Sequence, residues 1–346
     1  MLTENQIVQI REHLEKAQNP VFFFDNDGDG LCSFILLQRF IGRGKGVQIK
    51  SSPDMTVDYF RKVRELNADY IFILDKHSVS KEFFEEARQI NIPIVWIDHH
   101  DMGNEIPDFV NYYNPLFNDD NNEPVAELCY RITRRREDLW IAVAGCISDS
   151  FVPDFYSDFK KEYPDLAINS KEALKIYFKS PLGKIVKMLN FALKDTTTNV
   201  VSMMKFLTRA RSPYEVLEES RENYSMHKKF NEINDKYERL LKKVEFKTEE
   251  DVLFFEYGGD LSISSELANK LRFDFPDKII VVAYVKDAKV NVSARGENVR
   301  SFVIEAIKEL DNATGGGHEK AVGAKIHSRD LEKFKGIFLK LVRKSI

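Results

Sequence analysis

Cysteine is scarce in this chain of 346 residues. Its three cysteines, Cys32, Cys129 and Cys146, are far apart and lie outside any CxxC spacing. This pattern argues against a disulfide framework and a zinc knuckle, and it favours a reducing compartment. No apolar stretch approaches the roughly 18 to 20 residues of a membrane span, and the amphipathic N-terminal segment has no signal-peptide core. We therefore expect a cytoplasmic protein with no membrane contact.

An excess of positive charge is also missing. The chain has 51 Lys and Arg against 55 Asp and Glu, and its formal net charge is -4 at pH 7. This balance argues against a protein that coats DNA, because any contact with nucleic acid must come from a local basic patch. Hydrophobic residues make up 43% of the chain, which is ordinary for a globular protein that buries a core.

The first part of the chain alternates short apolar runs with helical patterns. Within residues 20–97 the runs PVFFF, YIFIL and IPIVWI are separated by amphipathic segments. Continuous apolar strands between amphipathic helices are typical of a parallel sheet with helices on both faces. Further on, the long apolar segment LWIAVAGCISDS predicts a buried helix. We predict an α/β fold with a doubly wound, mainly parallel sheet in a first domain over residues 1–156.

The pattern turns helical over residues 157–250. Its last part, residues 213–244, is highly charged, has Pro213 near its start and has few internal breakers, so we predict a long connecting helix. Strand-like runs such as VLFFEY and KIIVVAYV then return, followed by a helical stretch at 299–310, the glycine-rich TGGGHEKAVGAKI and a terminal helix. Residues 251–346 are therefore predicted to form a second, smaller α/β domain.

Unusual acidic and histidine residues gather where the predicted strands of the first domain end. Ligands of open α/β sheets bind outside the carboxyl ends of the strands, where the loops converge. An aspartate that follows the apolar AVAGCIS segment could reach the same edge. The residues concerned are Asp25, Asp27, Asp29, Asp75, Asp98, His99, His100 and Asp149.

So many carboxylates in one crevice would destabilise one another unless cations held them, because clustered like charges raise each other's pKa. Oxygen ligands with one or two imidazoles suit Mn²⁺, Mg²⁺ or Zn²⁺, and Mn²⁺ fits the mixed set best. Five aspartates and a histidine exceed the needs of one ion, so we expect two ions that share a bridging carboxylate. Paired metals are the usual arrangement for displacement at phosphorus, which predicts phosphoester hydrolysis.

Each motif also has an ordinary structural interpretation. The sequence DNDGDG alone resembles a calcium loop or a polar turn, and Asp75 could simply cap the following helix. Adjacent histidines can be ordinary loop residues. The conjunction of four clusters at strand ends favours the metal centre.

The segment IDHH at residues 97–100, together with DNDGDG, the strand-end Asp75 and GCISDS, resembles the DHH phosphoesterase superfamily. The segment GGGHEKAVGA at residues 315–324 is similar to the signature of the DHH-associated C-terminal domain. The DxDxDG form resembles the RecJ-like nucleases, and the chain length resembles their compact archaeal-type members. The resemblance spans nearly the whole chain and implies a site for two metal ions, usually Mn²⁺.

The resemblance also implies roles for individual residues. Asp27 and Asp75 would hold one ion, with Asp25 nearby. The second ion would be held by Asp29, Asp75, His99 and Asp149, so that Asp75 is the bridge. His100 would act on the substrate phosphate or beside the ligands, and Asp98 would orient a histidine. One departure is Phe23, because many members of the family carry a histidine ligand at this position.

In the second domain the resemblance implies a substrate-binding set. The backbone N–H groups of the glycine segment would approach the phosphate backbone closely, since glycine has no side chain. An arginine in NVSARG would contact phosphate, for which its planar guanidinium is suited. These residues are Arg295, Gly315, Gly316, Gly317 and His318. A flexible turn is the alternative interpretation of the three glycines.

These features predict a metal-dependent exonuclease that releases nucleoside monophosphates from single-stranded DNA or RNA by two-metal hydrolysis, with a role in DNA repair. Short oligonucleotides or cyclic dinucleotides are the alternative substrates. A catalytically silent replisome scaffold is a third interpretation, and a replication or repair protein is a candidate partner. The basic segment RITRRRED at residues 131–138 favours a polymer, although a solvated helix face explains it equally well.

Overall fold

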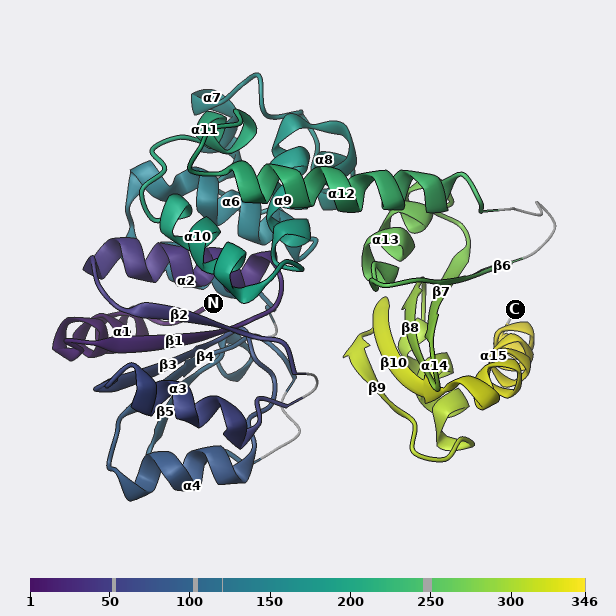
Figure 1. The fold of residues 1–346 in the computed structure, drawn as a ribbon, viewed down its shortest axis with the longest axis horizontal. Coiled ribbons are helices and arrows are strands. Elements are labelled where there is room, and N and C mark those ends of the chain that lie inside the picture. The colour runs from purple at the N-terminus through teal and green to yellow at the C-terminus, as the bar shows by residue number, and fades with distance from the viewer. Residues whose placement is uncertain (52–53, 102–104, 120, 245–250, 346) are drawn as a thin grey trace. The chain divides into compact units, whose positions relative to one another are not determined.

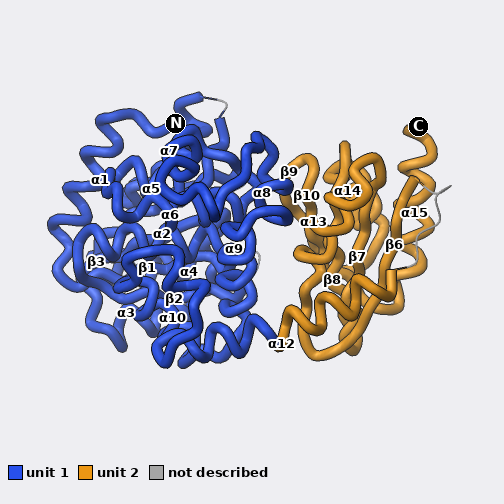
Figure 2. Tube along the Cα trace, turned by 90° about the horizontal axis from the view of Figure 1, so that it is seen from above, with its two compact units in different colours: residues 1–231 blue, residues 232–346 orange. Residues whose placement is uncertain are grey.

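The structure is a computed structural model that describes residues 1–51, 54–101, 105–119, 121–244 and 251–345. The chain forms two compact units, Met1–Asn231 and Glu232–Ile346, which are coloured blue and orange in Figure 2. We call them unit 1 and unit 2 and describe each by itself. The predicted domain boundaries at residues 156 and 250 stay predictions.

Unit 1 contains a five-stranded sheet in the order β2-β1-β3-β4-β5, and every pairing in it is parallel. The predicted parallel α/β sheet is therefore confirmed. In register, Asp25 lies opposite Ile49, and Leu74 lies opposite Ile97, so the strands end at one edge. The strands are β1 (Pro20–Asp25), β2 (Lys45–Ile49), β3 (Tyr70–Leu74), β4 (Ile94–Ile97) and β5 (Val110–Tyr113).

Helices cover both faces of this sheet (Figure 1). Phe23 of β1 belongs to the core cluster that includes Phe60 and Phe83, from the helices on one face. The neighbouring Phe24 stacks on Phe34 from the other face, with ring centroids 5.3 Å apart. Both faces of the central strands are thus buried, which explains their continuous apolar sequences.

The first helices are α1 (Glu4–Lys16), α2 (Gly28–Ile41), α3 (Phe60–Glu65), α4 (Lys81–Gln89), α5 (Val125–Thr133) and α6 (Leu139–Ser148). Short 3₁₀ turns form η1 (Val57–Tyr59), η2 (Pro115–Phe117) and η3 (Arg136–Asp138).

Helix α6 is the predicted buried helix, and its residues from Leu139 to Ile147 are all buried. It is apolar on every side, as is typical of a helix surrounded by other elements. Six helices follow, namely α7 (Tyr156–Glu162), α8 (Ala173–Lys179), α9 (Pro181–Ala192), α10 (Thr197–Leu207), α11 (Pro213–Leu217) and α12 (Tyr224–Leu241).

The connecting helix is α12, and it is shorter than the stretch that the charge pattern indicated. The prediction of one helix from Pro213 onwards is wrong, because the backbone of Glu218 is extended and ends α11. The side chain of Asn223 stabilises the turn that follows. It accepts a hydrogen bond from the Ser220 N–H and donates to the carbonyls of Glu215 and Glu218. Asparagine favours such turns because its side chain can replace backbone partners.

Unit 2 contains a mixed sheet in the order β6-β7-β8-β10-β9, in which β6 and β7 are parallel and the other pairs are antiparallel. The strands are β6 (Val252–Gly258), β7 (Ile279–Lys286), β8 (Lys289–Arg295), β9 (Thr314–His318) and β10 (Ala321–His327). The helices are α13 (Ser264–Asp274), α14 (Val299–Lys308) and α15 (Leu331–Ser345), and η4 (Ser328–Asp330) is a 3₁₀ turn.

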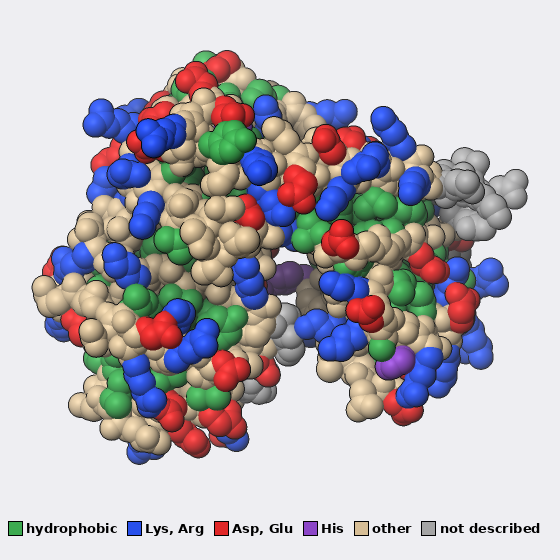
Figure 3. Space-filling model, viewed as in Figure 1, with side chains coloured by type: hydrophobic (Ala, Val, Ile, Leu, Met, Phe, Trp, Pro, Cys, Tyr) green, Lys and Arg blue, Asp and Glu red, His purple; other side chains and the backbone are tan. Residues whose placement is uncertain are grey.

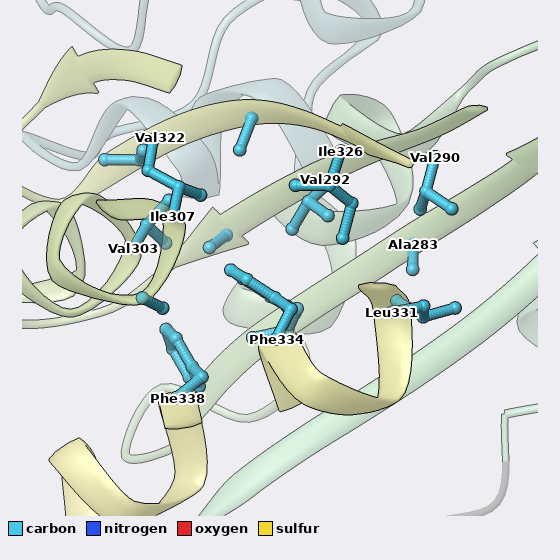
Figure 4. Close-up of a cluster of buried hydrophobic side chains, with 14 of the residues drawn as sticks. Ala283, Val290, Val292, Val303, Ile307, Val322, Ile326, Leu331, Phe334 and Phe338 are labelled. Carbon is cyan, nitrogen blue, oxygen red and sulfur yellow. The ribbon is translucent and has the colours of Figure 1, made fainter. Parts of the chain in front are cut away.

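The core of unit 2 joins one face of this sheet to α14 and α15. Val292 and Ile326 of the sheet pack with Val303 of α14 and with Phe334 and Phe338 of α15 (Figure 4). The predicted smaller α/β domain is therefore confirmed. No helix among the described residues is both long enough and apolar enough to span a bilayer.

The glycine-rich segment is an edge strand, and the interpretation as a flexible turn is wrong. Gly315, Gly316 and Gly317 lie in β9, paired with β10. Gly317 has a φ of 142°, and a Cβ there would lie 2.4 Å from the Ala321 carbonyl oxygen. Glycine is required at this end of the hairpin, because no other residue adopts such a backbone without strain.

Candidate metal centre

The first loop of the centre depends on Gly30, the glycine that follows its three aspartates. Asp27 is the N-cap of α2 and accepts a hydrogen bond from the Gly30 N–H at 3.0 Å. A Cβ on Gly30 would lie 2.7 Å from the carbonyl oxygen of Asp25, so only glycine lets the first turn of α2 approach the end of β1 this closely. The turn holds Asp27 and Asp29 directly beyond the strand.

The first residues of α5 hold the side chain of Asp29 in place. Its side chain is 1% exposed, and its two oxygens accept hydrogen bonds from the N–H groups of Val125 and Ala126 at 2.8 and 2.7 Å. Free N–H groups at a helix N-terminus stabilise an anion. The carboxylate therefore has one fixed orientation at the edge of the sheet.

Asp75 follows β3 in a strained backbone conformation. Its φ is +58°, in the left-handed region that residues other than glycine rarely adopt. Its N–H continues the sheet by donating to the Ile97 carbonyl at 3.0 Å, and the residue is buried. Strain of this kind is typical of functional positions, where the surrounding structure maintains it.

The histidine loop follows β4 and is held by Asp98. The buried Asp98 carboxylate lies 2.8 Å from Nδ1 of His100 and accepts a hydrogen bond from the Tyr112 hydroxyl at 3.3 Å. Burial opposes ionisation of Asp98, but the hydrogen bond from His100 and the charges of His100 and His99 together outweigh it, and the pKa of Asp98 is lowered. Burial likewise opposes the imidazolium of His100, and the bond to Asp98 nevertheless raises the pKa of His100. The pairing therefore favours the charged forms of both groups and fixes the orientation of the His100 ring.

The side chains from these separate loops converge on Asp75. Nε2 of His99 lies 3.3 Å from Oδ1 of Asp75 and 3.8 Å from Oδ2 of Asp149. Ligand atoms of Asp29, Asp75 and His99 all lie within 4.8 Å of one another, and so do those of Asp75, Asp98 and His100. Asp75 belongs to both groups, although in the second of them Asp98 and His100 are already paired with each other.

The carboxylates of the centre are destabilised as anions. Burial, followed by the charge of Asp27, raises the pKa of Asp75 well above its usual range and that of Asp149 to about 7. Burial and the charges of Asp149 and Asp27 do the same for the pKa of Asp29. A divalent cation would remove this conflict, and a set of carboxylate oxygens with imidazole suits Mn²⁺ or Mg²⁺. The residues present therefore fit the metal site that the family implies.

Lys76 is a residue of the centre that the sequence did not predict. Its ammonium group is buried and donates hydrogen bonds to Oδ1 of Asp25 at 2.8 Å and to the Ser51 carbonyl at 3.0 Å. Asp25 thus already has a cationic partner, whereas Asp29 and Asp75 face His99. A lysine directly after a strand-end aspartate is visible in the sequence, but its partner is known only from the fold.

Phe23 occupies the position at which many members of the family carry a histidine ligand. Its side chain is fully buried in the hydrophobic core and packs edge-on against Phe83, with ring centroids 5.7 Å apart. The position therefore contributes packing and no metal ligand.

The predicted substrate-binding residues of unit 2 also come together. Arg295 at the end of β8 and His318 at the end of β9 both lie opposite Ala321 of β10 in the sheet register. The guanidinium of Arg295 donates to Oδ1 of Asn269 at 2.6 Å and to the Ala294 carbonyl at 2.9 Å, which fixes its position. One end of this sheet thus presents an arginine, a histidine and the glycine strand.

Fold and site together define a protein of two α/β units with a candidate metal centre at the edge of the first sheet. Models of two protein families match the chain: the DHH family, N-terminal domain, over residues 21–148, and the DHHA1 domain over residues 250–344. The chain belongs to the DHH superfamily. No curated protein matches its sequence.

Three solved proteins illustrate the folds to which this chain is similar. The RecJ of Thermus thermophilus, solved with Mn²⁺ and with Mg²⁺, superimposes in its Mn²⁺ form with a TM-score of 0.71 at 14% identity, covering 98% of this chain and 54% of that chain. This chain therefore spans about half of that nuclease. CDC45 from Entamoeba histolytica superimposes with a TM-score of 0.53 at 9% identity, and the match covers 97% of this chain and 98% of CDC45. The pGpG-specific phosphodiesterase PggH from Vibrio cholerae superimposes with a TM-score of 0.50 at 12% identity, and the match covers 94% of this chain and 99% of PggH.

Proposed function

We propose that this chain is a phosphodiesterase that releases nucleoside monophosphates from an end of single-stranded DNA or RNA. The observation that carries the proposal is the buried cluster of Asp29, Asp75 and His99, whose ligand atoms lie within 4.8 Å of one another at the edge of the sheet. Carboxylates that are crowded in this way need a cation, and the DHH family is one of phosphoesterases.

Asp29, Asp75, His99 and Asp149 would hold one divalent ion, and Asp27 and Asp75 would hold the second, with Asp25 nearby. Such ions supply Lewis-acid charge to the scissile phosphate and its leaving oxygen. The ammonium of Lys76 donates a hydrogen bond to Asp25, and Phe23 offers no ligand, so the second ion would have the poorer ligand set.

The remaining polar residues would bind and orient the substrate. His100, with its pKa raised by Asp98 despite burial, would donate a hydrogen bond to a phosphate oxygen. In unit 2, Arg295, His318 and those N–H groups of Gly315, Gly316 and Gly317 that do not pair with β10 would bind phosphate groups of the strand. Such positioning contributes to the rate because it fixes the phosphodiester before the reaction.

The test is a substrate panel with the full chain. End-labelled single-stranded DNA and RNA, a linear dinucleotide and pyrophosphate are incubated with Mn²⁺, with Mg²⁺ or with a chelator. We expect strands that shorten from one end, release of nucleoside monophosphates, and no reaction in chelator. Turnover of the dinucleotide alone would favour the activity of PggH, which shares the fold. No turnover of any substrate would favour a silent scaffold with a replication partner, an interpretation to which the fold shared with CDC45 gives weight.

Arg295→Ala tests the substrate-binding role of unit 2. Loss of a charge-assisted hydrogen bond to phosphate should raise KM about tenfold or more. Mn²⁺ binding, measured by titration calorimetry, should stay unchanged. Arg300→Ala is the control, because Arg300 is an exposed arginine of the same unit. An unchanged KM in the Arg295 variant would remove this arginine from the substrate site.

A further inference from the structure

We propose that a groove on unit 1 binds the part of a single-stranded nucleic acid that lies outside the scissile phosphodiester. The groove has a volume of about 1020 Å³ and lies between β2, the η1–α3 segment and α10. This inference rests on the proposed function and names its substrate class as a strand of several nucleotides. We refer to this site as the β2 groove.

The β2 groove begins beside the metal centre. Strand β2 is an edge strand of the sheet, and its carboxyl end adjoins the loop of Asp25. Gln48 in the groove donates a hydrogen bond to the Asn26 side chain, and the carbonyl of Ser51 accepts one from Lys76 at 3.0 Å. Lys76 in turn contacts Asp25. A strand whose scissile phosphate lies at the centre would therefore have the groove within reach of its next nucleotides.

The lining of the β2 groove is basic, although the chain as a whole carries a formal charge of -4. Six Lys or Arg and two acidic residues line it. Lys45, Lys50 and Lys205 are exposed, and in the part of the chain that the structure describes none of them pairs with a carboxylate. Figure 3 shows this face of unit 1, where Lys and Arg side chains are spread over β2, α3 and α10. Cations without carboxylate partners are suited to neutralise phosphates.

A second, smaller pocket continues the basic surface. It has a volume of about 410 Å³, shares Gln38 and Thr208 with the β2 groove and is lined by four arginines. Arg39 and Arg135 pair with the buried Asp138. Arg211 is exposed, and within residues 1–51, 54–101, 105–119, 121–244 and 251–345 its guanidinium forms no ion pair, although its backbone N–H donates to the Glu215 carboxylate at 2.9 Å. The second pocket thus extends the cationic surface beyond the β2 groove.

The floor of the β2 groove is apolar. Phe34, Val47, Val200 and Met204 line it together with the half-buried Tyr59. The Tyr59 hydroxyl accepts a hydrogen bond from the Lys50 N–H at 2.8 Å, which fixes the ring. Basic residues around an apolar, aromatic floor are typical of sites for single strands, because the bases pack inside while the phosphates face the cations. An acidic peptide that adds to the open edge of β2 would use the same cations, but it would have no reason to lie beside a phosphodiester centre.

The test uses the full chain and a 5′-labelled 20-nucleotide oligo(dT), with a chelator present so that binding is measured without hydrolysis. The double variant Lys45→Gln/Lys205→Gln removes one cation from each side of the β2 groove. We expect several-fold weaker binding and a salt dependence whose slope falls by about 1.4, since each phosphate contact on a single strand contributes about 0.7. With Mn²⁺ present, the kcat/KM for a linear dinucleotide should change less than twofold.

The control is Lys16→Gln/Lys161→Gln, which removes the same charge from exposed lysines that line neither pocket. Equal weakening by both variants, or none by either, would overturn the proposal. Binding of poly-glutamate without binding of oligo(dT) would also overturn it in favour of an acidic protein partner. A wild-type chain that binds oligo(dT) with the expected variant effect, yet hydrolyses no phosphodiester, would support the groove and refute the proposed function.

Discussion

Asp75 carries two unfavourable features at one position, a φ of +58° and a buried charge whose pKa is raised well above its usual range by burial and by Asp27. Neither feature contributes to folding. Both are expected where the geometry of a ligand is maintained by the rest of the structure. This residue is therefore the most direct test of the centre.

Asp75→Asn should abolish activity and keep the fold. Asparagine tolerates a left-handed backbone and has the same shape, so only the charge is lost. We expect kcat to fall by more than the roughly 10- to 100-fold that loss of a ligand's supporting partner costs. Wild-type turnover in this variant would show that Asp75 bridges no ions.

The same variant should unfold at a higher temperature than wild type in chelator at pH 7. The pKa of Asp75 is raised in the folded state, so the wild-type chain loses stability as pH rises above the unfolded value of about 3.9. The gain in the variant should therefore disappear near pH 3 to 4, where the carboxyl is protonated in both states. Asp108→Asn, at an exposed site, should show no such gain.

Lys76→Met tests whether the ammonium limits the second ion. The change leaves the half-buried Asp25 without its cation, so the metal-free chain should lose about 1 to 3 kcal/mol of stability. Mn²⁺ should restore more stability to this variant than to wild type, and the weaker of two Mn²⁺ affinities, followed by calorimetry, should increase. Lys76→Arg keeps the charge and should resemble wild type. Unchanged Mn²⁺ affinities in Lys76→Met would show that the lysine does not compete with a metal.

At the scale of elements, the sequence was sufficient to predict a strand wherever burial determines the pattern of apolar residues. β1, β3 and β4 are continuous apolar runs because both faces of the sheet are covered, and the order of parallel strands then places Asp75 and His99 at one edge. The split between α11 and α12 was missed because it depends on the hydrogen bonds of one side chain, Asn223. The strand β9 was missed because three consecutive glycines carry no alternation of side chains.

The partner of Lys76 could not be predicted for a different reason. Lys76 is 51 residues away from Asp25 in the sequence and 25 residues away from Ser51, whose carbonyl it also contacts. No local pattern encodes such a contact. Site residues that directly follow an apolar strand were therefore predictable from the sequence. A residue such as Lys76, whose partner is distant in the sequence, could be identified only from the structure.

Gly30→Ala tests the turn that joins β1 to α2. The added Cβ would lie 2.7 Å from the Asp25 carbonyl oxygen and 2.8 Å from its nitrogen, and backbone cannot yield as a flexible side chain can. We expect a loss of about 1 to 3 kcal/mol in the free energy of unfolding and weaker Mn²⁺ binding, since Asp27 and Asp29 must move. Gly336→Ala is the control, because nothing lies within 4 Å of its Cβ and it sits within α15, where alanine should add up to about 1 kcal/mol. Equal stability of the two variants would show that the turn relaxes without cost.

At the scale of the whole molecule, two compact units with separate sheets and cores should unfold in separable steps. The acidic ligands all belong to unit 1, so scanning calorimetry should show one transition that Mn²⁺ raises and one that it leaves in place. At a hundredfold excess over Kd a bound ion adds about 2.7 kcal/mol to the stability of the state that binds it.

The shift of this transition by Mn²⁺ should grow between pH 6 and pH 8, because burial and Asp27 raise the pKa of Asp149 to about 7 and the ion binds only its ionised form. Equal shifts of both transitions would show that Mn²⁺ binding is not confined to unit 1, and a shift independent of pH would remove Asp149 from the ligands.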